Sequence, residues 1–504
     1  MSSHPITIGV VVFYLISLLV IGYLSSQKAK GGLNDFFLAG RNLGKWTVAL
    51  SAVSSGRSGW LILGLTGIAY ASGLDAVWAV AGYITVEVFM FFFVARRFRK
   101  YSEKHDSITV PDILASRYGD KNNLLRITSS LIIIFFMIAY VGSQVVAGGT
   151  AFSSSLGVSN GTGMGLTAAI LLVYVMLGGF HAVSKTDVLQ AFFMFGALVI
   201  LPILAIINLG GFGPILETMH SQGGGFTSPF AFAFGAIGGL VGIGFGSPGN
   251  PHILVRYMSL KNIKEMKQAA LIASVWNVIM GWGGIMIGLA GRAMFPDISM
   301  LPGENRETIF TTLGNEILDP FTMGILLVAM LAAIMSSADS QLLVGSSAIV
   351  RDIYDRIIAK GKVIPQKKLI LYSRISTVIM MILAVALAIT AQEFVFWMVL
   401  FAFGGLGACF GPALLLSFYW KGTTKQGIFW GMIIGLLTVI LVKKQPEWTF
   451  TFLPDMKALS GKLLFGITYE AVPGFIMALI ITVMVSKFTQ KPDNAEEVIN
   501  DLAS

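Results

Sequence analysis

The chain has 504 residues, of which 55% belong to the apolar set and 12% are charged. That charged fraction is about half the usual quarter for a soluble protein, so a water-soluble globule could not cover its surface with it. The 57 glycines and 36 phenylalanines indicate a polytopic membrane protein, because glycine is tolerated inside helices where neighbouring helices pack against it. Cys409 is the only cysteine, which excludes an intramolecular disulfide and a cysteine-based metal cluster.

The hydrophobic stretches predict an all-α integral membrane protein. A span needs roughly 20 apolar residues to cross about 30 Å of hydrocarbon, and this window gives about 13 transmembrane helices. The first stretch lacks a basic leader and a cleavage pattern, so we expect it to be a retained span. The predicted spans are residues 6–25, 47–71, 77–95, 127–150, 161–179, 188–209, 229–248, 267–291, 320–347, 370–391, 394–419, 426–442 and 471–487.

In a membrane protein, the basic residues behind the net charge of +9 first indicate which side of the membrane each loop faces, and only then a binding partner. When the loops are assigned to alternate sides, most Lys and Arg fall on one side, including Arg96, Arg97 and Arg99. The positive-inside rule then predicts a cell (inner) membrane protein with its N-terminus outside and its C-terminus in the cytoplasm. The outer stretch 443–462 is the exception. The positive charge is therefore explained by the sidedness of a protein in a lipid bilayer, and no nucleic-acid partner is needed to account for it.

Two spans carry interruptions at matching places, residues 54–56 in the second and residues 242–249 in the seventh. Glycine and proline weaken helices, and paired interrupted helices indicate the binding site of a transporter. The alternative is that both are glycine-rich packing faces. We therefore expect two inverted five-helix repeats with broken first helices. The resulting division is an additional span at 1–30, repeats at 47–209 and 229–419, two further spans within 426–487, and a short tail at 488–504.

The ninth span carries oxygen atoms on one helical face. Ala333, Ser336, Ser337 and Ser340 recur at helical spacing, and Asp339 lies three residues from Ser336. Hydroxyl, carbonyl and carboxylate oxygens suit a hard cation, and the absence of a carboxylate cluster favours a monovalent one. The alternative is a small-residue packing face whose serines bond to their own helix.

Charged residues at bilayer depth need a partner, an ion or water. Arg57 follows the first interruption and Glu87 lies in the middle of the next span. The two could form a supporting ion pair, or Arg57 could clamp a substrate carboxylate, and both could hold. Asp187 opens the sixth span and could be an ordinary interface residue.

Six motifs together resemble the sodium:solute symporter family, and within it the sodium/proline symporter branch. They cover nearly the whole chain in order and spacing. The motifs are residues 36–44 (FFLAGRNLG), 49–64 (ALSAVSSGRSGWLILG), 178–190 (GGFHAVSKTDVLQ), 249–258 (GNPHILVRYM), 335–354 (MSSADSQLLVGSSAIVRDIY) and 404–412 (GGLGACFGP).

The resemblance implies a thirteen-span protein with a LeuT-like core of two inverted five-helix repeats. It also implies a site for transported sodium between the second and ninth spans, and no organic cofactor. The implied sodium ligands are the carbonyls of Ser54, Arg57 and Ala333 and the hydroxyls of Ser336 and Ser337.

Some members of the family hold a second sodium between the ninth and sixth spans. The matching residues here are Asp187, Ser336, Asp339 and Ser340. Asp339 departs from the family, in which a small or hydroxyl residue is frequent at this place. It could strengthen a second cation site or create a proton-sensitive one.

The substrate side matches less well. The proline branch has an acidic residue and a methionine where this chain has Gly56 and Arg57, and it has a Trp and a Tyr where this chain has Ile243 and Ser247. Two lost aromatic side chains predict a larger or differently shaped pocket. The substrate contacts that the resemblance implies are Gly56, Arg57, Ser58, Trp60, Trp78, Gln144, Ser247 and Pro251.

These observations predict a sodium-coupled symporter that imports a small organic solute, proline or a related amino acid, and not an enzyme. The alternatives are a monocarboxylate or a sugar as the solute, with Arg57 favouring an anion unless Glu87 neutralises it. A transporter-like sensor is disfavoured because no signalling domain follows the last span. The number of sodium ions, one or two, and a homo-oligomeric state are left open.

Overall fold

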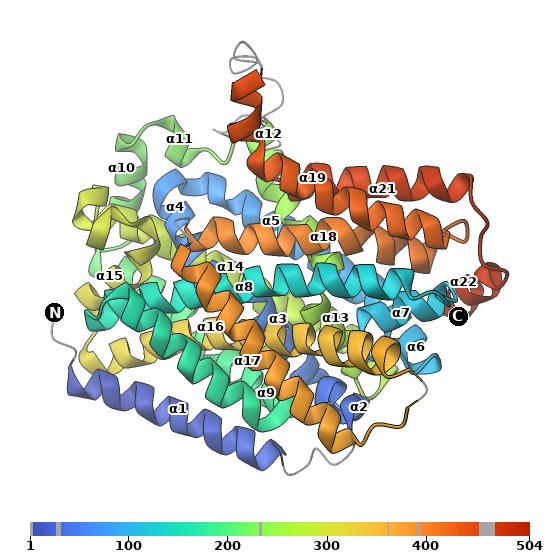
Figure 1. Ribbon diagram of the computed structural model, residues 1–504. Coiled ribbons are helices and arrows are strands. Elements are labelled where there is room, and N and C mark those ends of the chain that lie inside the picture. Colours follow the sequence, from blue (N-terminus) through green and yellow to red (C-terminus); the bar gives the residue numbers. More distant parts are fainter. Residues whose placement is uncertain are drawn as a thin grey trace.

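The computed structural model describes residues 4–26, 32–230, 234–360, 362–390, 394–452 and 469–503. These residues are almost wholly helical, and their long helices run side by side across the view of Figure 1. Helices suit a bilayer because they satisfy every backbone polar group within the segment. The start of α1 and the C-terminal helix α22 lie at opposite ends of the bundle (Figure 1).

The first half of the chain turns back on itself after each long helix. Two π-helical segments, Trp60–Leu65 and Met90–Val94, continue one α-helix into the next. Gly73, whose φ is 69°, makes the turn between the second and third predicted spans. The helices are α1 (Pro5–Ser26), α2 (Leu33–Leu38), α3 (Lys45–Gly59), α4 (Thr66–Ser72), α5 (Val77–Phe89), α6 (Ala95–Lys104), α7 (Val110–Arg117), α8 (Leu124–Leu156) and α9 (Asn160–Asn208).

The second half has the same helical character. A parallel β-bridge between Leu43 and Leu260 joins the loops on one side of the bundle. The helices are α10 (Gly213–Ser221), α11 (Gly224–Thr227), α12 (Phe234–Val241), α13 (Pro251–Ser259), α14 (Met266–Met294), α15 (Ile309–Ile317), α16 (Pro320–Ser347), α17 (Gln366–Thr390), α18 (Val395–Tyr419), α19 (Lys425–Phe452), α21 (Ala471–Lys487) and α22 (Ala495–Ala503).

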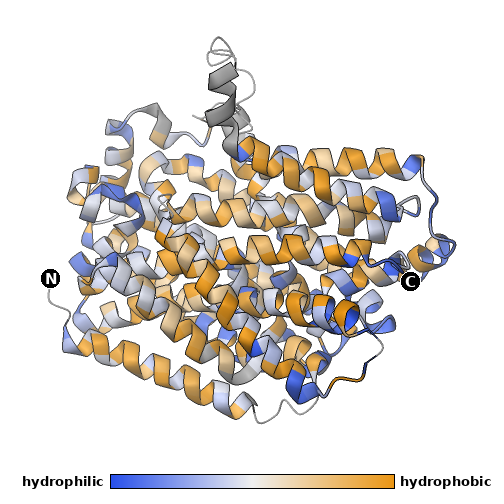
Figure 2. Cartoon of the chain, viewed as in Figure 1, coloured by the Kyte–Doolittle hydropathy of each residue, from blue (hydrophilic) through white to orange (hydrophobic). Residues whose placement is uncertain are grey.

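The core of the bundle lies around α16 and α18. Among the described residues, 9 helical stretches are long and apolar enough to cross a membrane, by length and composition. In α16 and α18, 83% of the most apolar window is buried, against 28% in α1. Figure 2 shows apolar residues along the helices and hydrophilic residues gathered at their ends. The membrane class is as predicted, whereas the number of crossings stays a prediction, and the outer stretch 443–462 lies partly outside the described residues.

The interruption of the second span lies slightly later than predicted. Ser54, Ser55 and Gly56 are helical, and the backbone leaves the helix at Ser58, with φ 24° and ψ −174°. The freed amide of Gly59 donates to Gln144 Oε1 at 3.0 Å. The serines do not break the helix because the Ser55 hydroxyl donates to a carbonyl of another helix, the Ser336 carbonyl, at 2.6 Å.

The seventh span is also interrupted, and it continues further than predicted. A 3₁₀ segment, Gly242–Gly249, follows α12, and extended Asn250 separates it from α13. Every residue of α13 is buried, so the span does not end at residue 248. Arg256, which lies between the predicted spans 229–248 and 267–291, is instead buried inside the bundle.

The predicted loop between the fifth and sixth spans is replaced by one residue. Gly179 has φ 58° and ψ −166° within α9, and the helix resumes at once. Asp187 consequently lies more than two turns into the sixth span and is fully buried. Its expected place at the start of the sixth span was wrong, because a glycine that adopts positive φ needs no loop to change the direction of the chain, and its burial does not fit an ordinary interface residue.

Gly179→Ala should lower the melting temperature of the detergent-purified protein. An alanine there would hold a combination of positive φ and extended ψ that is essentially restricted to glycine, at a cost of about 1–3 kcal/mol. Its Cβ would also lie 2.8 Å from Phe36 Cδ2. The matched control is Gly196→Ala in the same helix, where nothing lies within 4 Å of an added Cβ. This control should melt at or above the wild-type temperature, and equal losses in both variants would contradict the packing of Gly179.

Candidate ion and substrate sites

Serine hydroxyls of α16 bind backbone carbonyls of the interrupted helix α3. Ser336 Oγ donates to the Ser54 carbonyl at 3.1 Å and is also 3.3 Å from the Ala333 carbonyl. Ser337 Oγ donates to the Ser55 carbonyl at 2.8 Å. All five residues are buried. The contact therefore gathers hydroxyl and carbonyl oxygens from both helices at one place.

Most of the predicted sodium ligands meet at this contact. The Ser54 and Ala333 carbonyls share the Ser336 hydroxyl, and Ser337 lies beside them on the same helix. The carbonyl of Arg57 instead accepts the Trp60 amide at the interruption. Neutral oxygen donors of this kind fit a monovalent hard cation. The Ser55 carbonyl was not predicted, although its place beside Ser54 could have indicated it.

A second cluster holds Arg57 inside the bundle. Its Nη2 forms an ion pair with Glu87, and its Nε donates to Asn277 Oδ1 at 2.9 Å. Asn277 Nδ2 in turn donates to Glu87 Oε2 at 2.7 Å. The guanidinium carbon lies 3.9 Å from the centre of the Tyr83 ring, which is a cation–π contact. Asn277 and Tyr83 were missed, although a polar residue within the apolar span 267–291 was a signal for Asn277.

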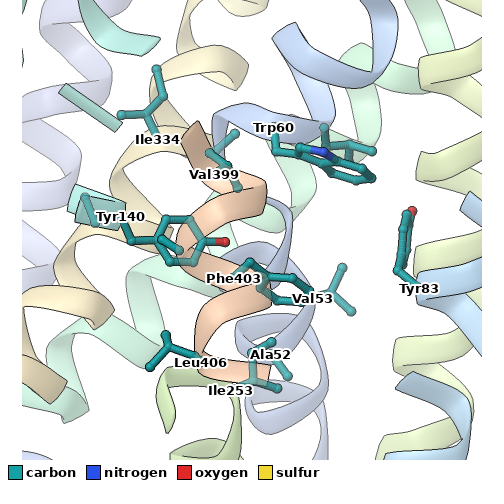
Figure 3. Close-up of a cluster of buried hydrophobic side chains, with 14 of the residues drawn as sticks. Ala52, Val53, Trp60, Tyr83, Tyr140, Ile253, Ile334, Val399, Phe403 and Leu406 are labelled. Carbon is teal, nitrogen blue, oxygen red and sulfur yellow. The ribbon is translucent and has the colours of Figure 1, made fainter. Parts of the chain in front are cut away.

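A small cavity, with room for about one water molecule, lies next to this cluster. Trp60, Tyr83, Tyr140, Val399 and Phe403 line it and come from both repeats of the predicted architecture. Figure 3 shows the side chains of these five residues within a buried hydrophobic cluster. The buried Trp60 Nε1 and Tyr83 hydroxyl have no hydrogen-bond partner among the described residues. Such groups are costly to bury unless something binds them. The full lining is Gly56, Arg57, Ser58, Trp60, Tyr83, Tyr140, Ile243, Val399, Leu400 and Phe403.

The predicted substrate residues divide between this cavity and other places. Gly56, Arg57, Ser58 and Trp60 line it. Gln144 instead caps the Gly59 amide. These residues meet because the interruption of α3 turns its backbone toward the cavity.

Three further predicted substrate residues lie outside the cavity lining. Ser247 is buried in the second interruption, and its hydroxyl has no partner among the described residues. Trp78 donates to the Pro229 carbonyl and packs against Phe230, because it lies in the first turn of α5, well before Tyr83. Pro251 starts α13 and lines a different, apolar cavity. Trp78 and Pro251 therefore do not line this cavity, and their role as substrate contacts stays a prediction.

A third cluster joins α3, α9, α13 and α16 around Arg256. Its Nη2 donates to Asp187 Oδ2 at 2.9 Å, to Ser55 Oγ at 2.6 Å and to Ser340 Oγ at 2.5 Å. Its Nε donates to Ser51 Oγ at 3.0 Å. Sequence reasoning missed Arg256 because it ended the seventh span too early.

Asp339 lies at the edge of the Arg256 cluster. Its Oδ1 accepts from the Ser340 hydroxyl at 2.9 Å, and its Oδ2 has no hydrogen-bond partner among the described residues. Asp339 and Asp187 are both fully buried. The predicted second sodium ligands therefore do lie together, but a guanidinium lies among them.

The fold is shared with solved transporters. A Na⁺-coupled sialic acid symporter in a substrate-bound, outward-open state superposes with a TM-score of 0.78 and 19% identity, over 97% of this chain and 99% of that one. A nucleobase-cation-symport-1 family transporter in a closed conformation gives a TM-score of 0.54 and 12% identity, over 93% of this chain and 98% of that one. The chain therefore has the fold of these solved structures, a LeuT-like fold.

Sequence comparison then specifies the family. The profile of the sodium:solute symporter family matches residues 36–435. Sodium/proline symporters of Staphylococcus aureus strains COL and MW2 are each 37% identical over 487 residues, which is 96% of this chain and 93% of theirs. The chain belongs to the sodium:solute symporter family.

Glu87→Gln should lower the free energy of unfolding by about 3–5 kcal/mol, because it leaves the Arg57 charge buried without a counter-charge. The double variant Arg57→Met/Glu87→Leu should lose less than Glu87→Gln alone, because no charge remains. Thermal unfolding in detergent gives the order. Lys421→Met is the control, because the Lys421–Glu496 pair is exposed and worth less than about 1 kcal/mol. Equal losses in the buried and exposed pairs would contradict this account.

Proposed function

We propose that the protein couples sodium entry to the import of proline or a closely related small amino acid. The observation that carries the proposal is the contact between α3 and α16, which places the Ser336 and Ser337 hydroxyls against the Ser54 and Ser55 carbonyls beside the interrupted helix. The names of the S. aureus relatives support proline as the solute.

The charges beside the cavity favour a solute without net charge. Glu87 already neutralises Arg57, so the argument from Arg57 for a monocarboxylate loses its basis. An amino acid is a zwitterion and matches a neutral site. The cavity lining is mostly apolar and aromatic, which suits an apolar ring better than the many hydroxyl groups of a sugar.

The free polar groups suggest how an amino acid would bind. Trp60 Nε1 and the Tyr83 hydroxyl are donors for a carboxylate, and Trp60 lies 5.3 Å from Tyr83 between ring centres. The backbone carbonyls of Gly56 and Ser58, two residues that line the cavity, would accept a hydrogen bond from an ammonium group. In this proposal Arg57 orients Glu87 and does not clamp the solute by itself.

Sodium and solute would act on the same helix. An ion held by oxygens of α3 and α16 fixes the distance between these helices, and α3 carries Gly56 and Ser58 of the cavity. Each ligand therefore stabilises the arrangement that the other binds, and this coupling is reciprocal. Movement of the core around this site would then expose it to the other side.

We also propose the membrane placement that the charges predict. The N-terminus would lie outside and the C-terminus in the cytoplasm of the cell membrane, with repeats at 47–209 and 229–419. The opposite placement of α1 and α22 in Figure 1 supports termini on different sides. A homo-oligomer is compatible with the apolar outer faces of the helices.

Proteoliposomes with an inward sodium gradient should accumulate labelled proline. A tenfold gradient is worth about 1.4 kcal/mol and 100 mV about 2.3 kcal/mol per charge, so one ion supports roughly 500-fold accumulation. Potassium in place of sodium is the control and should abolish accumulation. Uptake that does not depend on sodium, or that is inhibited by an excess of monocarboxylate or sugar instead of amino acids, would contradict the proposal.

Ser337→Ala should raise the sodium concentration for half-maximal uptake by about tenfold, because a hydrogen-bonding group to a charge is worth about 1.5–3 kcal/mol. The matched control is Ser346→Ala in the same predicted span, because Ser346 Oγ donates to the Ser373 carbonyl, away from α3. Its sodium dependence should stay at the wild-type value. An unchanged sodium dependence of Ser337→Ala would remove Ser337 from the site.

A further inference from the structure

The Arg256 guanidinium occupies the middle of a polar cluster formed by four helices. Its Nη2 contacts oxygen atoms of Ser55, Asp187 and Ser340, at 2.6, 2.9 and 2.5 Å. Its Nη1 donates to the carbonyl of His252, one turn earlier in α13. The guanidinium carbon also lies 5.1 Å from the centre of the Phe180 ring. Donors and ring contact together hold the charge in place.

These oxygens are largely the ones that a second sodium ion would need. Of the predicted ligands, Asp187 and Ser340 bind the guanidinium directly. The Ser336 hydroxyl is directed to the Ser54 and Ala333 carbonyls at the first site. Asp339 accepts a hydrogen bond from Ser340. Among the described residues, no hydrogen bond joins Asp339 to Arg256. A sodium ion bound to Asp187 and Ser340 would therefore compete with Nη2 for the same oxygens.

The positive charge of Arg256 also disfavours a sodium ion at Asp187 Oδ2 and Ser340. Sodium at this place would lie next to a fixed positive charge that cannot deprotonate in a protein. The guanidinium supplies one positive charge next to Asp187, and the Ser51 hydroxyl adds a hydrogen bond to Asp187 Oδ2 at 2.6 Å. Asp339, which bonds to Ser340, is a second buried carboxylate at the edge of the same cluster. Asp187 Oδ2 is thus bound by a cation that is covalently part of the chain, whereas Asp187 Oδ1 and Asp339 Oδ2 have no hydrogen-bond partner among the described residues.

We propose that Arg256 permanently fills the second cation position, so that the protein binds and couples a single sodium ion at the α3–α16 contact. This inference rests on the proposed function for the coupling of the first ion. It also assigns Arg256 a positioning role: one end of its side chain is fixed in α13, behind the second interruption, and the other end binds α3 and α16. It therefore links both interrupted helices to the sodium-binding helix.

Sodium binding to the purified protein tests this inference without any solute. Equilibrium binding of radioactive sodium should give about one ion per wild-type molecule, and about two for Arg256→Gln, which frees Asp187 and Ser340. Arg256→Lys keeps the charge and should stay at about one ion. Arg256→Gln/Asp187→Asn removes the freed carboxylate and should also return to about one. Two ions in the wild type, or one in Arg256→Gln, would overturn the inference.

Two measurements separate the possible failures. Size-exclusion profiles and melting temperatures show whether Arg256→Gln is folded, and if it is not, the wild-type ion count alone decides. Sodium-driven uptake in proteoliposomes is measured on the same preparations. Wild-type protein that binds one sodium ion but does not import proline would overturn the proposed solute and leave the Arg256 assignment supported. Sodium-driven proline import by wild-type protein that binds two sodium ions would support the proposed solute and overturn the Arg256 assignment.

Discussion

The structure depends on the contact between an interrupted helix and a continuous, buried one. In a bilayer, backbone groups that leave a helix must find partners inside the protein. Here Gln144 takes the Gly59 amide, and the serines of α16 take carbonyls of α3. The same hydroxyl and carbonyl oxygens that make the interruption tolerable are the ones that suit a monovalent cation. Ion binding and helix geometry are therefore properties of one contact.

Buried charge is compensated differently at two arginines. Arg57 has one carboxylate partner, Glu87, and an aromatic ring, so its cluster is neutral and borders a cavity. Arg256 lies among hydroxyls and the carboxylate of Asp187, and its Nη2 binds Ser55, Asp187 Oδ2 and Ser340. The first arrangement suits an exchangeable neutral solute, and the second suits a permanent cation.

The cavity combines apolar walls with a few unused donors. Phe403, Val399 and the Trp60 ring provide the apolar surface (Figure 3), and Trp60 Nε1 and the Tyr83 hydroxyl remain available within it. A small ring with polar groups at one end fits this distribution better than a solute that is polar all round. Selectivity would then come from a small number of hydrogen bonds in a dry pocket, where an unpaired group is costly.

The sequence by itself determined the membrane class and the approximate place of most long helices, because hydrophobic length is a local property, and helical spacing placed Ser336 and Ser337 on one face of the ninth span. It also paired Arg57 with Glu87 correctly. Only the tertiary structure decided the partners of Asp187, since Arg256 reaches it from a helix distant in sequence. Likewise, Trp60 and Trp78 are close in sequence, yet Trp60 lines the cavity and Trp78 packs against Phe230. Such contacts depend on how helices cross, and that is set by packing over the whole bundle.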